Sequence, residues 1–291
     1  MAIACRRGAI WHVAEPRPVG DIGTLFARLI AEADGAPVAI GADLPIGVPR
    51  AYAAQRTEPD FRRFLAATAN WADFYRVCTS LDELNPERPF YPARGIKGMT
   101  RAAHAAALGL GDAVGLSRAC DRATVERPAG APLFWTLGAN QTGKAAITAW
   151  RDMLLPALDT VRLWPFDGPF LSLPTPGHVA LAETYPAEAM RHLAIPTKGS
   201  KRRQSDRAAV AGPLHDAMTR LNAVPDAGMA RCIADGFGPD AAGEDRFDCT
   251  LGLLCVINVL SGHRPDTAPA DPWLTQWEGW VLGQTALPVS R

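Results

Sequence analysis

The sequence predicts an α/β fold in which a mixed sheet is flanked by helices. Short apolar runs at residues 1–5, 9–13 and 38–42 are bounded by turn-forming residues, as β-strands usually are. Before the third run, residues 21–33 carry apolar side chains at helical spacing. Strands that alternate with helices in this way are typical of α/β sheets.

The rest of the chain continues this alternation. Apolar segments predict further strands at 133–137, 161–166 and 179–182. Helical spacing predicts helices at 58–85, 101–110, 145–158, 186–193, 208–223, 226–234 and 244–261. We expect the strands near residues 1–5, 9–14, 38–42 and 179–183 to share one sheet.

Composition places the chain among ordinary globular proteins. It has 291 residues, of which 48% are hydrophobic and 21% charged, so it can bury a large core. No segment has the composition of a linker. We therefore expect one domain over residues 1–264, with a tail that contains Pro and Trp, residues 265–291, packed on it.

Charge and cysteine content narrow the possible functions. With 30 Lys and Arg against 30 Asp and Glu, no global basic field attracts nucleic acid, and any such contact must be local. The six cysteines form no CxxC pair, which argues against the usual zinc and redox motifs. The longest apolar stretch, 249–260, is too short to cross a bilayer, and the start lacks the apolar core of a signal peptide. We expect a cytoplasmic protein with reduced thiols and no membrane partner.

Acidic residues stand at the ends of predicted strands and at the start of a predicted helix. Asp43 and Glu183 each end an apolar run. Asp245 and Asp248 begin the helix 244–261 and, three positions apart, share one of its faces. Carboxylates at one edge of a sheet can converge, and Mg²⁺ or Mn²⁺ takes such oxygen ligands.

Each of these acids also has a structural interpretation. Asp245 lies in the first helical turn, where a negative charge favours the helix dipole. Glu183 could pair with Arg191 or Lys198. Asp248 lies deeper among apolar neighbours, so capping explains it less well.

A basic run follows Glu183 along the chain. Clustered cations beside acids suit phosphate contacts next to a metal site, whereas a solvated loop is the alternative interpretation. The run comprises Lys198, Lys201, Arg202, Arg203 and Arg207.

A glycine-containing segment, residues 138–144, nearly matches the phosphate-binding P-loop between a strand and a helix. Ala145 stands where the P-loop needs a hydroxyl for magnesium, so we expect no ATP hydrolysis. Backbone N–H groups and Lys144 could still bind a phosphate group. A glycine-rich turn with a solvated lysine is the alternative.

Taken together, several short segments resemble a family of predicted nucleases with the RNase H-like fold, catalogued as domain of unknown function 429. The matching segments occur in the expected order: residues 41–49, 134–143 and 182–188, Lys201 with Arg207, and residues 244–249. The resemblance implies a mixed sheet that begins with a β-hairpin, flanking helices, and acids gathered at one edge for Mg²⁺ or Mn²⁺.

The chain departs from this family at its start. RNase H-like enzymes carry an essential Asp on their first strand, whereas residues 1–13 resemble the second and third strands. No Asp precedes Asp21. We therefore expect an RNase H-like sheet whose first strand is missing or truncated, which would impair catalysis.

These observations predict a metal-dependent phosphodiester hydrolase, similar to nucleases, that acts on nucleic acid or a small phosphodiester. The expected metal ligands are Asp43, Glu183 and Asp248, with Asp245 as a further catalytic residue. Phosphate would bind Lys198, Lys201, Arg207 and Lys144. The alternatives are a non-catalytic RNase H-like scaffold or binding protein, and a phosphate- or nucleotide-binding enzyme that uses residues 138–144. Whether the chain is an enzyme, which substrate it takes and how it assembles stay open.

Overall fold

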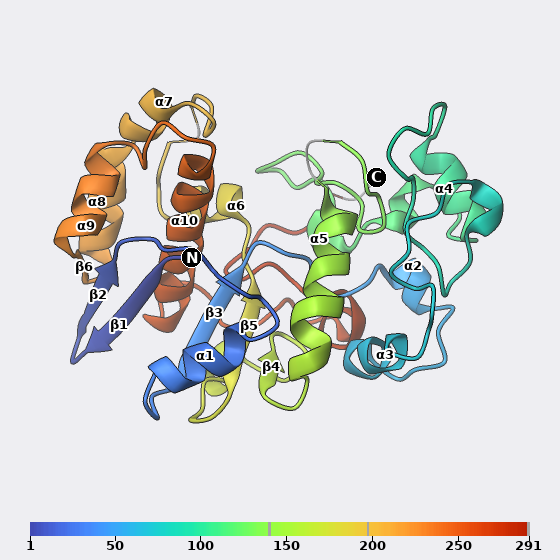
Figure 1. Cartoon of the computed structure of the whole chain (residues 1–291), viewed down its shortest axis with the longest axis horizontal. Helices are drawn as coiled ribbons and strands as arrows, with labels where there is room; N and C mark the ends of the chain where they lie inside the picture. Colours follow the sequence, from blue (N-terminus) through green and yellow to red (C-terminus); the bar gives the residue numbers. More distant parts are fainter. Residues whose placement is uncertain (139–140, 197, 290–291) are drawn as a thin grey trace.

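The strands of the computed structural model form two three-stranded sheets, one mixed and one parallel, flanked by helices (Figure 1). The structure describes residues 1–138, 141–196 and 198–289. Within them, the fold is α/β as the sequence predicts.

The first sheet has the order β1-β2-β6, and the second has the order β3-β5-β4. The hairpin strands β1 and β2 are antiparallel, and β2 pairs with β6 in parallel. All pairs of the second sheet are parallel. The strands are β1 (Ile3–Arg7), β2 (Ile10–Ala14), β3 (Val38–Ala42), β4 (Val161–Leu163), β5 (Val179–Glu183) and β6 (Ala223–Pro225).

The prediction that β1, β2, β3 and β5 share one sheet is wrong. Within the described ranges, β1 pairs only with β2 and β3 pairs only with β5 among the named strands. Each therefore keeps one free edge. An apolar run identifies a strand from local sequence alone, whereas pairing depends on which other strand reaches its edge. The bounds of these four strands were predicted to within a few residues, but their partners were not.

The long helix α10 (Ala242–Leu260) lies between the two sheets in Figure 1 and packs against β3 and α6. Apart from Asn258, its second half is apolar on all sides, as expected for a helix buried in a core. The other α-helices are α1 (Leu25–Glu32), α2 (Arg50–Ala53), α3 (Phe61–Thr68), α4 (Arg101–Ala107), α5 (Thr142–Thr148), α6 (Pro186–His192), α7 (Gln204–Ala208), α8 (Ala211–Arg220) and α9 (Ala227–Ala234).

Aromatic side chains fill the core beneath α3 and α5. The ring centroids of Phe64 and Phe74 lie 5.6 Å apart, and Phe61 contacts Trp150 at 5.5 Å. This packing explains why the predicted helix 58–85 is confirmed only over α3. The chain turns after Thr68 and brings Phe74 back onto Phe64, so tertiary contacts override the helical spacing.

Two other expectations differ from the structure. Residues 133–137 form no strand, because Trp135 pairs with Tyr91 only through an isolated bridge. The helix expected at 145–158 begins earlier, at Thr142, and continues as a π-helical segment over Ala149–Leu154.

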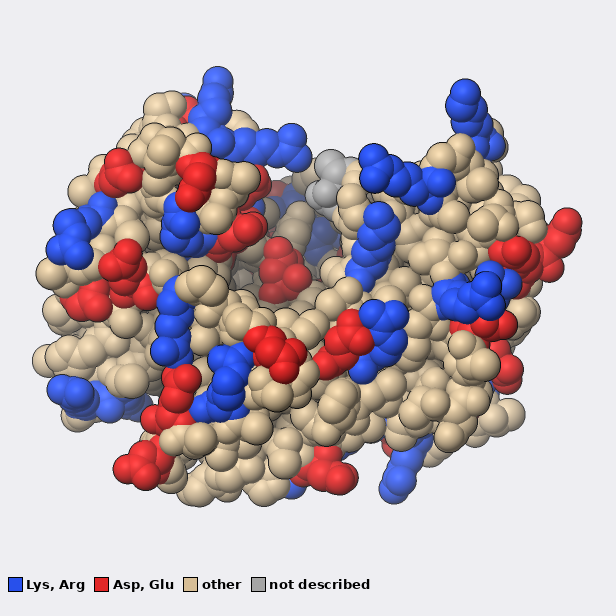
Figure 2. Space-filling view, viewed as in Figure 1, with Lys and Arg blue, Asp and Glu red and all other residues tan. Residues whose placement is uncertain are grey.

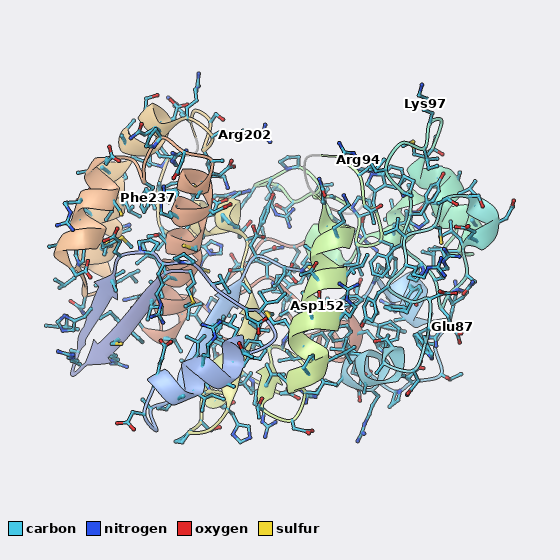
Figure 3. All side chains as sticks on the ribbon, in the orientation of Figure 1. Glu87, Arg94, Lys97, Asp152, Arg202 and Phe237 are labelled. Carbon is cyan, nitrogen blue, oxygen red and sulfur yellow. The ribbon has the colours of Figure 1, made fainter. Side chains whose placement is uncertain are left out.

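Apolar side chains of α8, α9 and α10 pack together in a second core cluster. Phe237, labelled in Figure 3, lies in this part of the molecule, and its ring centroid is 5.4 Å from that of Phe247. This second core cluster includes residues of the β1-β2-β6 sheet and holds the first half of α10 in place. That half of the helix carries Asp248.

The C-terminal segment is built into the core. Trp280 is buried, Val281 forms a β-bridge with Glu183, and the Leu282 N–H donates to the Glu183 carbonyl at 2.8 Å. Gly279 approaches the Ile46 carbonyl so closely that an added Cβ would lie 2.0 Å from its oxygen. The segment therefore fixes the end of β5. None of the described helices is both long enough and apolar enough to span a membrane.

Candidate functional site

A cavity of about 590 Å³ opens at the C-terminal ends of β3 and β5. Figure 2 shows a hollow in this face of the molecule, with acidic side chains at its floor and basic side chains near its rim. The charged side chains that line the cavity are Asp43, Arg118, Asp121, Arg127, Lys144 and Glu183. Both signs of charge therefore meet in one space, as a site for a phosphate group and a cation would require.

Asp43 is the first residue after β3 and precedes a stiff turn that contains Pro45. Its side chain reaches solvent, and it makes no hydrogen bond or ion pair with the rest of the described chain. Protein atoms nevertheless surround the carboxyl, and this desolvation is the largest cause that raises its pKa to about 7. The negative charges of Asp248 and Glu183 raise the pKa further, whereas Lys201 lowers it. Asp43 thus lies within electrostatic reach of both other acids.

Glu183, at the end of β5, is fully partnered. Arg118 donates to its two carboxylate oxygens at 2.6 and 2.7 Å, and the Ile46 N–H donates to one of them at 2.9 Å. The same guanidinium also binds Asp121 through two hydrogen bonds of 2.9 Å. Burial raises the pKa of Glu183, and the Arg118 charge opposes that shift.

The side chains of Cys120, Asp121 and Glu183 bring three possible metal-binding atoms within 4.8 Å of one another. The Arg118 guanidinium already binds both carboxylates of this group. Burial also raises the pKa of the Cys120 thiol well above its usual range, which disfavours the thiolate that a metal needs. This cluster therefore does not fit a metal ion, because an arginine supplies its cation.

Asp248, on the first half of α10, binds an amine instead of a guanidinium. The Lys201 ammonium donates to its two carboxylate oxygens at 2.7 and 2.6 Å, and both side chains are partly exposed. Burial raises the pKa of Asp248, and Lys201 opposes the shift. Because Lys201 also lowers the pKa of Asp43, one ammonium lies near both acids.

The other predicted site residues are more dispersed. Asp245 is exposed, and its charge helps to raise the pKa of Asp248. Lys198 is exposed and forms no ion pair with any described residue. Arg202, which also belongs to the basic run, projects beside α7 in Figure 3 and is 3.9 Å from Glu244.

Arg207 is not free to bind phosphate as expected. Its side chain is buried and donates to the backbone carbonyls of Gly236 at 2.8 Å, Gly238 at 2.6 Å and Lys201. It therefore holds the segment of Lys201 against the loop before α10. The sequence shows that this segment is basic, but it does not show which of its side chains are buried.

Lys144 lies on α5, is exposed and lines the cavity. Gly143 touches the Trp135 carbonyl so closely that an added Cβ would lie 2.9 Å from its oxygen, which explains one glycine of this segment by packing. Residues 139–140 of the predicted phosphate loop lie outside the described part of the chain.

Sequence reasoning missed the arginines of this site. Arg118 stands 65 positions before Glu183, and Arg127 donates to the backbone carbonyls of Cys120 and Pro128 with its guanidinium 5.7 Å from the Tyr185 ring centroid. Nothing in the spacing of residues 118–127 distinguishes them from a solvated loop, so no sequence signal indicates that they are buried.

Comparisons of the chain with protein-family models, with curated proteins and with solved structures find no match. The chemistry of the cavity therefore has to be inferred from its own residues.

Proposed function

We propose that the chain is a metal-dependent phosphodiester hydrolase, similar to nucleases, whose cation is Mg²⁺ or Mn²⁺. The observation that carries this proposal is Asp43, a carboxylate without a partner among the described residues, whose pKa is raised by burial and by two neighbouring acids. Like charges held together in this way favour binding of a cation. Hard divalent cations prefer carboxylate oxygens, and Asp43 and Asp248 supply them from the end of β3 and from α10.

Lys201 supports the same interpretation. Its ammonium binds Asp248 and lowers the pKa of Asp43, so its charge acts on both acids as a bound cation would. A divalent ion at these two acids would compete with the ammonium, and Lys201 would then be free to bind a phosphate oxygen. Glu183 differs from the sequence-based expectation, because Arg118 and Ile46 use both of its oxygens. We therefore assign Glu183 a positioning role rather than a place among the metal ligands.

A bound divalent ion would polarise the phosphate and lower the pKa of an attacking water. The chain's own residues then have separate tasks. Lys144, which lines the cavity, and Lys201, once released from Asp248, would neutralise charge on the phosphate oxygens. Arg118 holds Glu183, and Glu183 holds the Ile46 N–H, so that the turn after Asp43 keeps its position. Asp43 and Asp248 can act as ligands of the divalent ion only when their carboxyl groups are ionised.

The RNase H-like fold is part of this proposal. A β-hairpin followed by a helix and a strand, with acids after β3 and at the end of β5, agrees with that arrangement. An RNase H-like sheet would also hold a further strand beside β1 and β3, and each of these strands has a free edge in the described structure.

The substrate class that fits is nucleic acid or a small phosphodiester. The chain has no net charge, so the contacts to phosphate must come from the few cations around the cavity. All six cysteines are free thiols. Free thiols suit a reducing compartment, and we infer that the protein acts in the cytoplasm.

The test is Mn²⁺ binding, by electron paramagnetic resonance, together with cleavage of bis(p-nitrophenyl) phosphate. We expect Asp43→Asn and Asp248→Asn to weaken Mn²⁺ binding at least about tenfold and to reduce cleavage by a similar factor. Asp216→Asn is the matched control, because Asp216 is an exposed acid on α8. Equal binding and cleavage by Asp43→Asn and the unaltered chain would contradict the proposal.

A non-catalytic scaffold is the second candidate, and a specific observation favours it. Lys201 and Arg118 already neutralise part of the acidic charge, so the fold can hold these acids together without a metal. In that case the unaltered chain would neither bind Mn²⁺ nor cleave the ester, and the structure-stabilising ion pairs would be the whole role of the acids.

A further inference from the structure

A second cavity of about 490 Å³ lies where the C-terminal ends of α6, α8 and α10 meet. Its polar wall includes Arg220, Asn258, His263 and Arg264, and its apolar wall is formed by Leu193, Ala217 and Leu221. It shares no lining residue with the first cavity. Nothing in the function proposed above uses these residues.

Two polar groups at this cavity lack hydrogen-bond partners among the described residues. The Asn258 residue is 6% exposed, and its side-chain amide, which is not among the fully buried atoms, makes no hydrogen bond within the described chain. The Nε atom of Arg264 is buried and also has no hydrogen-bond partner in the described structure. Buried polar groups are nearly always hydrogen-bonded, so an unpartnered buried donor of Arg264 at this cavity, beside the free amide of Asn258, indicates a ligand that supplies acceptors.

The charge of the cavity is positive. No acidic side chain lines it, and Arg264 forms no ion pair within the described part of the chain. The nearby acid Glu188 accepts a hydrogen bond from His192 at 3.0 Å and forms an ion pair with Arg127 at 3.4 Å. Its charge is therefore balanced by Arg127 and does not balance that of Arg264. Arg264 is partly buried without a counter-charge among the described residues, and a bound anion would supply that charge.

Helix capping does not account for this arrangement. Carbonyl groups at the ends of helices attract cations, and Arg220 does donate to the Leu193 carbonyl at 2.6 Å. That bond uses one N–H of Arg220 and leaves others free. Arg264 makes no such bond with any described carbonyl, so its position is not explained by the helix ends.

We propose that this second cavity binds a small organic oxyanion, either a carboxylate or a phosphate monoester. The oxygen atoms accept hydrogen bonds from Arg264, Arg220 and the Asn258 amide. The apolar body of the ligand packs against Leu193 and Leu221. A bidentate guanidinium contact with an oxyanion is one of the stronger hydrogen-bonding arrangements in proteins.

The test is calorimetric titration of the full chain with phenyl phosphate, benzoate and inorganic phosphate at constant ionic strength. We expect phenyl phosphate or benzoate to bind more tightly than inorganic phosphate, because only they fill the apolar wall. Arg264→Gln should weaken that binding about tenfold, the loss expected when a hydrogen bond to a charged group is removed. Tighter binding of phenyl phosphate would identify the ligand as a phosphate monoester, and tighter binding of benzoate would identify it as a carboxylate.

Matched variants keep this proposal falsifiable. Arg231→Gln, at an exposed position on α9, should leave binding unchanged. If Arg264→Gln does not fold, Asn258→Ala replaces it, with folding checked by circular dichroism. Binding that survives both Arg264→Gln and Asn258→Ala would overturn the proposal. So would binding abolished by Lys144→Ala in the first cavity, or the absence of binding up to about 10 mM ligand, an affinity too weak for a built site.

Discussion

Two carboxylates of the candidate site, one inside the first cavity and one outside its lining, are each held by a cation, but in different ways. Glu183 and Arg118 are buried and form a bidentate pair with a third partner, Ile46. Asp248 and Lys201 are partly exposed, and the lysine lies within reach of a second acid, Asp43. Arginine presents a rigid planar fork, whereas lysine presents a compact charge on a flexible chain. The comparison separates an acid that holds the structure from acids that can exchange their cation.

The buried pair should show the largest effect on stability. Arg118→Ala leaves Glu183 and Asp121 without their cation in a buried setting, which costs about 3–5 kcal/mol. We expect a loss of that size in the free energy of unfolding, measured with urea. Arg231→Ala, at an exposed position on α9, is the control and should change it by less than about 0.5 kcal/mol.

A double variant sharpens this prediction. Arg118→Met with Glu183→Leu removes both charges, and replacing a buried ion pair by apolar groups is often nearly neutral. We therefore expect the double variant to be more stable than Arg118→Ala. If it were equally unstable, the Arg118 contacts to Asp121 and Ile46 would matter more than its pair with Glu183.

The contrast between the two pairs also marks how far the sequence could predict this molecule. The apolar runs at β3 and β5 and the helix α10 are local patterns, and their bounds agree with the structure to within a few residues. The two separate sheets and the turn after Thr68 depend on contacts between distant segments. Local spacing does not contain that information.

The candidate site shows the same division. Asp43 and Glu183 could be found because each ends an apolar run, and Asp248 because it begins an apolar helix. Arg118 could not be found, since its pairing with Glu183 exists only after the chain folds. Arg207 was misassigned for the related reason that its burial under Gly236 and Gly238 is invisible in a basic run.

Asp43 should give stability an unusual dependence on pH. Its pKa rises from 3.8 to about 7 on folding, so the folded state prefers the protonated carboxyl. The resulting penalty is absent below pH 3.8, grows as pH rises to about 7, and stays constant above that. Because the side chain keeps contact with solvent, we expect the full penalty to be only about 1–2 kcal/mol.

Asp43→Asn measures this penalty directly. The variant should be more stable than the unaltered chain at pH 8, and the difference should fade as the pH of the urea titration approaches 4. Asp216→Asn, which changes an exposed acid on α8, should show no such trend. A constant difference between Asp43→Asn and the unaltered chain at both pH values would mean that Asp43 is not held against other acids.

Lys201→Met should have the smallest effect on stability. It is also the sharpest test of whether a divalent ion can replace the Lys201 ammonium at Asp43 and Asp248. A partly exposed ion pair contributes about 0–1 kcal/mol, so the variant should unfold at nearly the same urea concentration. It should bind Mn²⁺ more tightly, by roughly tenfold, because the competing ammonium is gone and two acids share one unneutralised site. Its rate of ester cleavage should nevertheless fall, since Lys201 can no longer bind the phosphate.

Tighter Mn²⁺ binding with slower cleavage is a combination that a purely structural lysine would not produce. If Lys201→Met instead weakened Mn²⁺ binding, the ammonium would be organising Asp43 and Asp248 rather than standing in for their cation, and the distinction between the two pairs would fail.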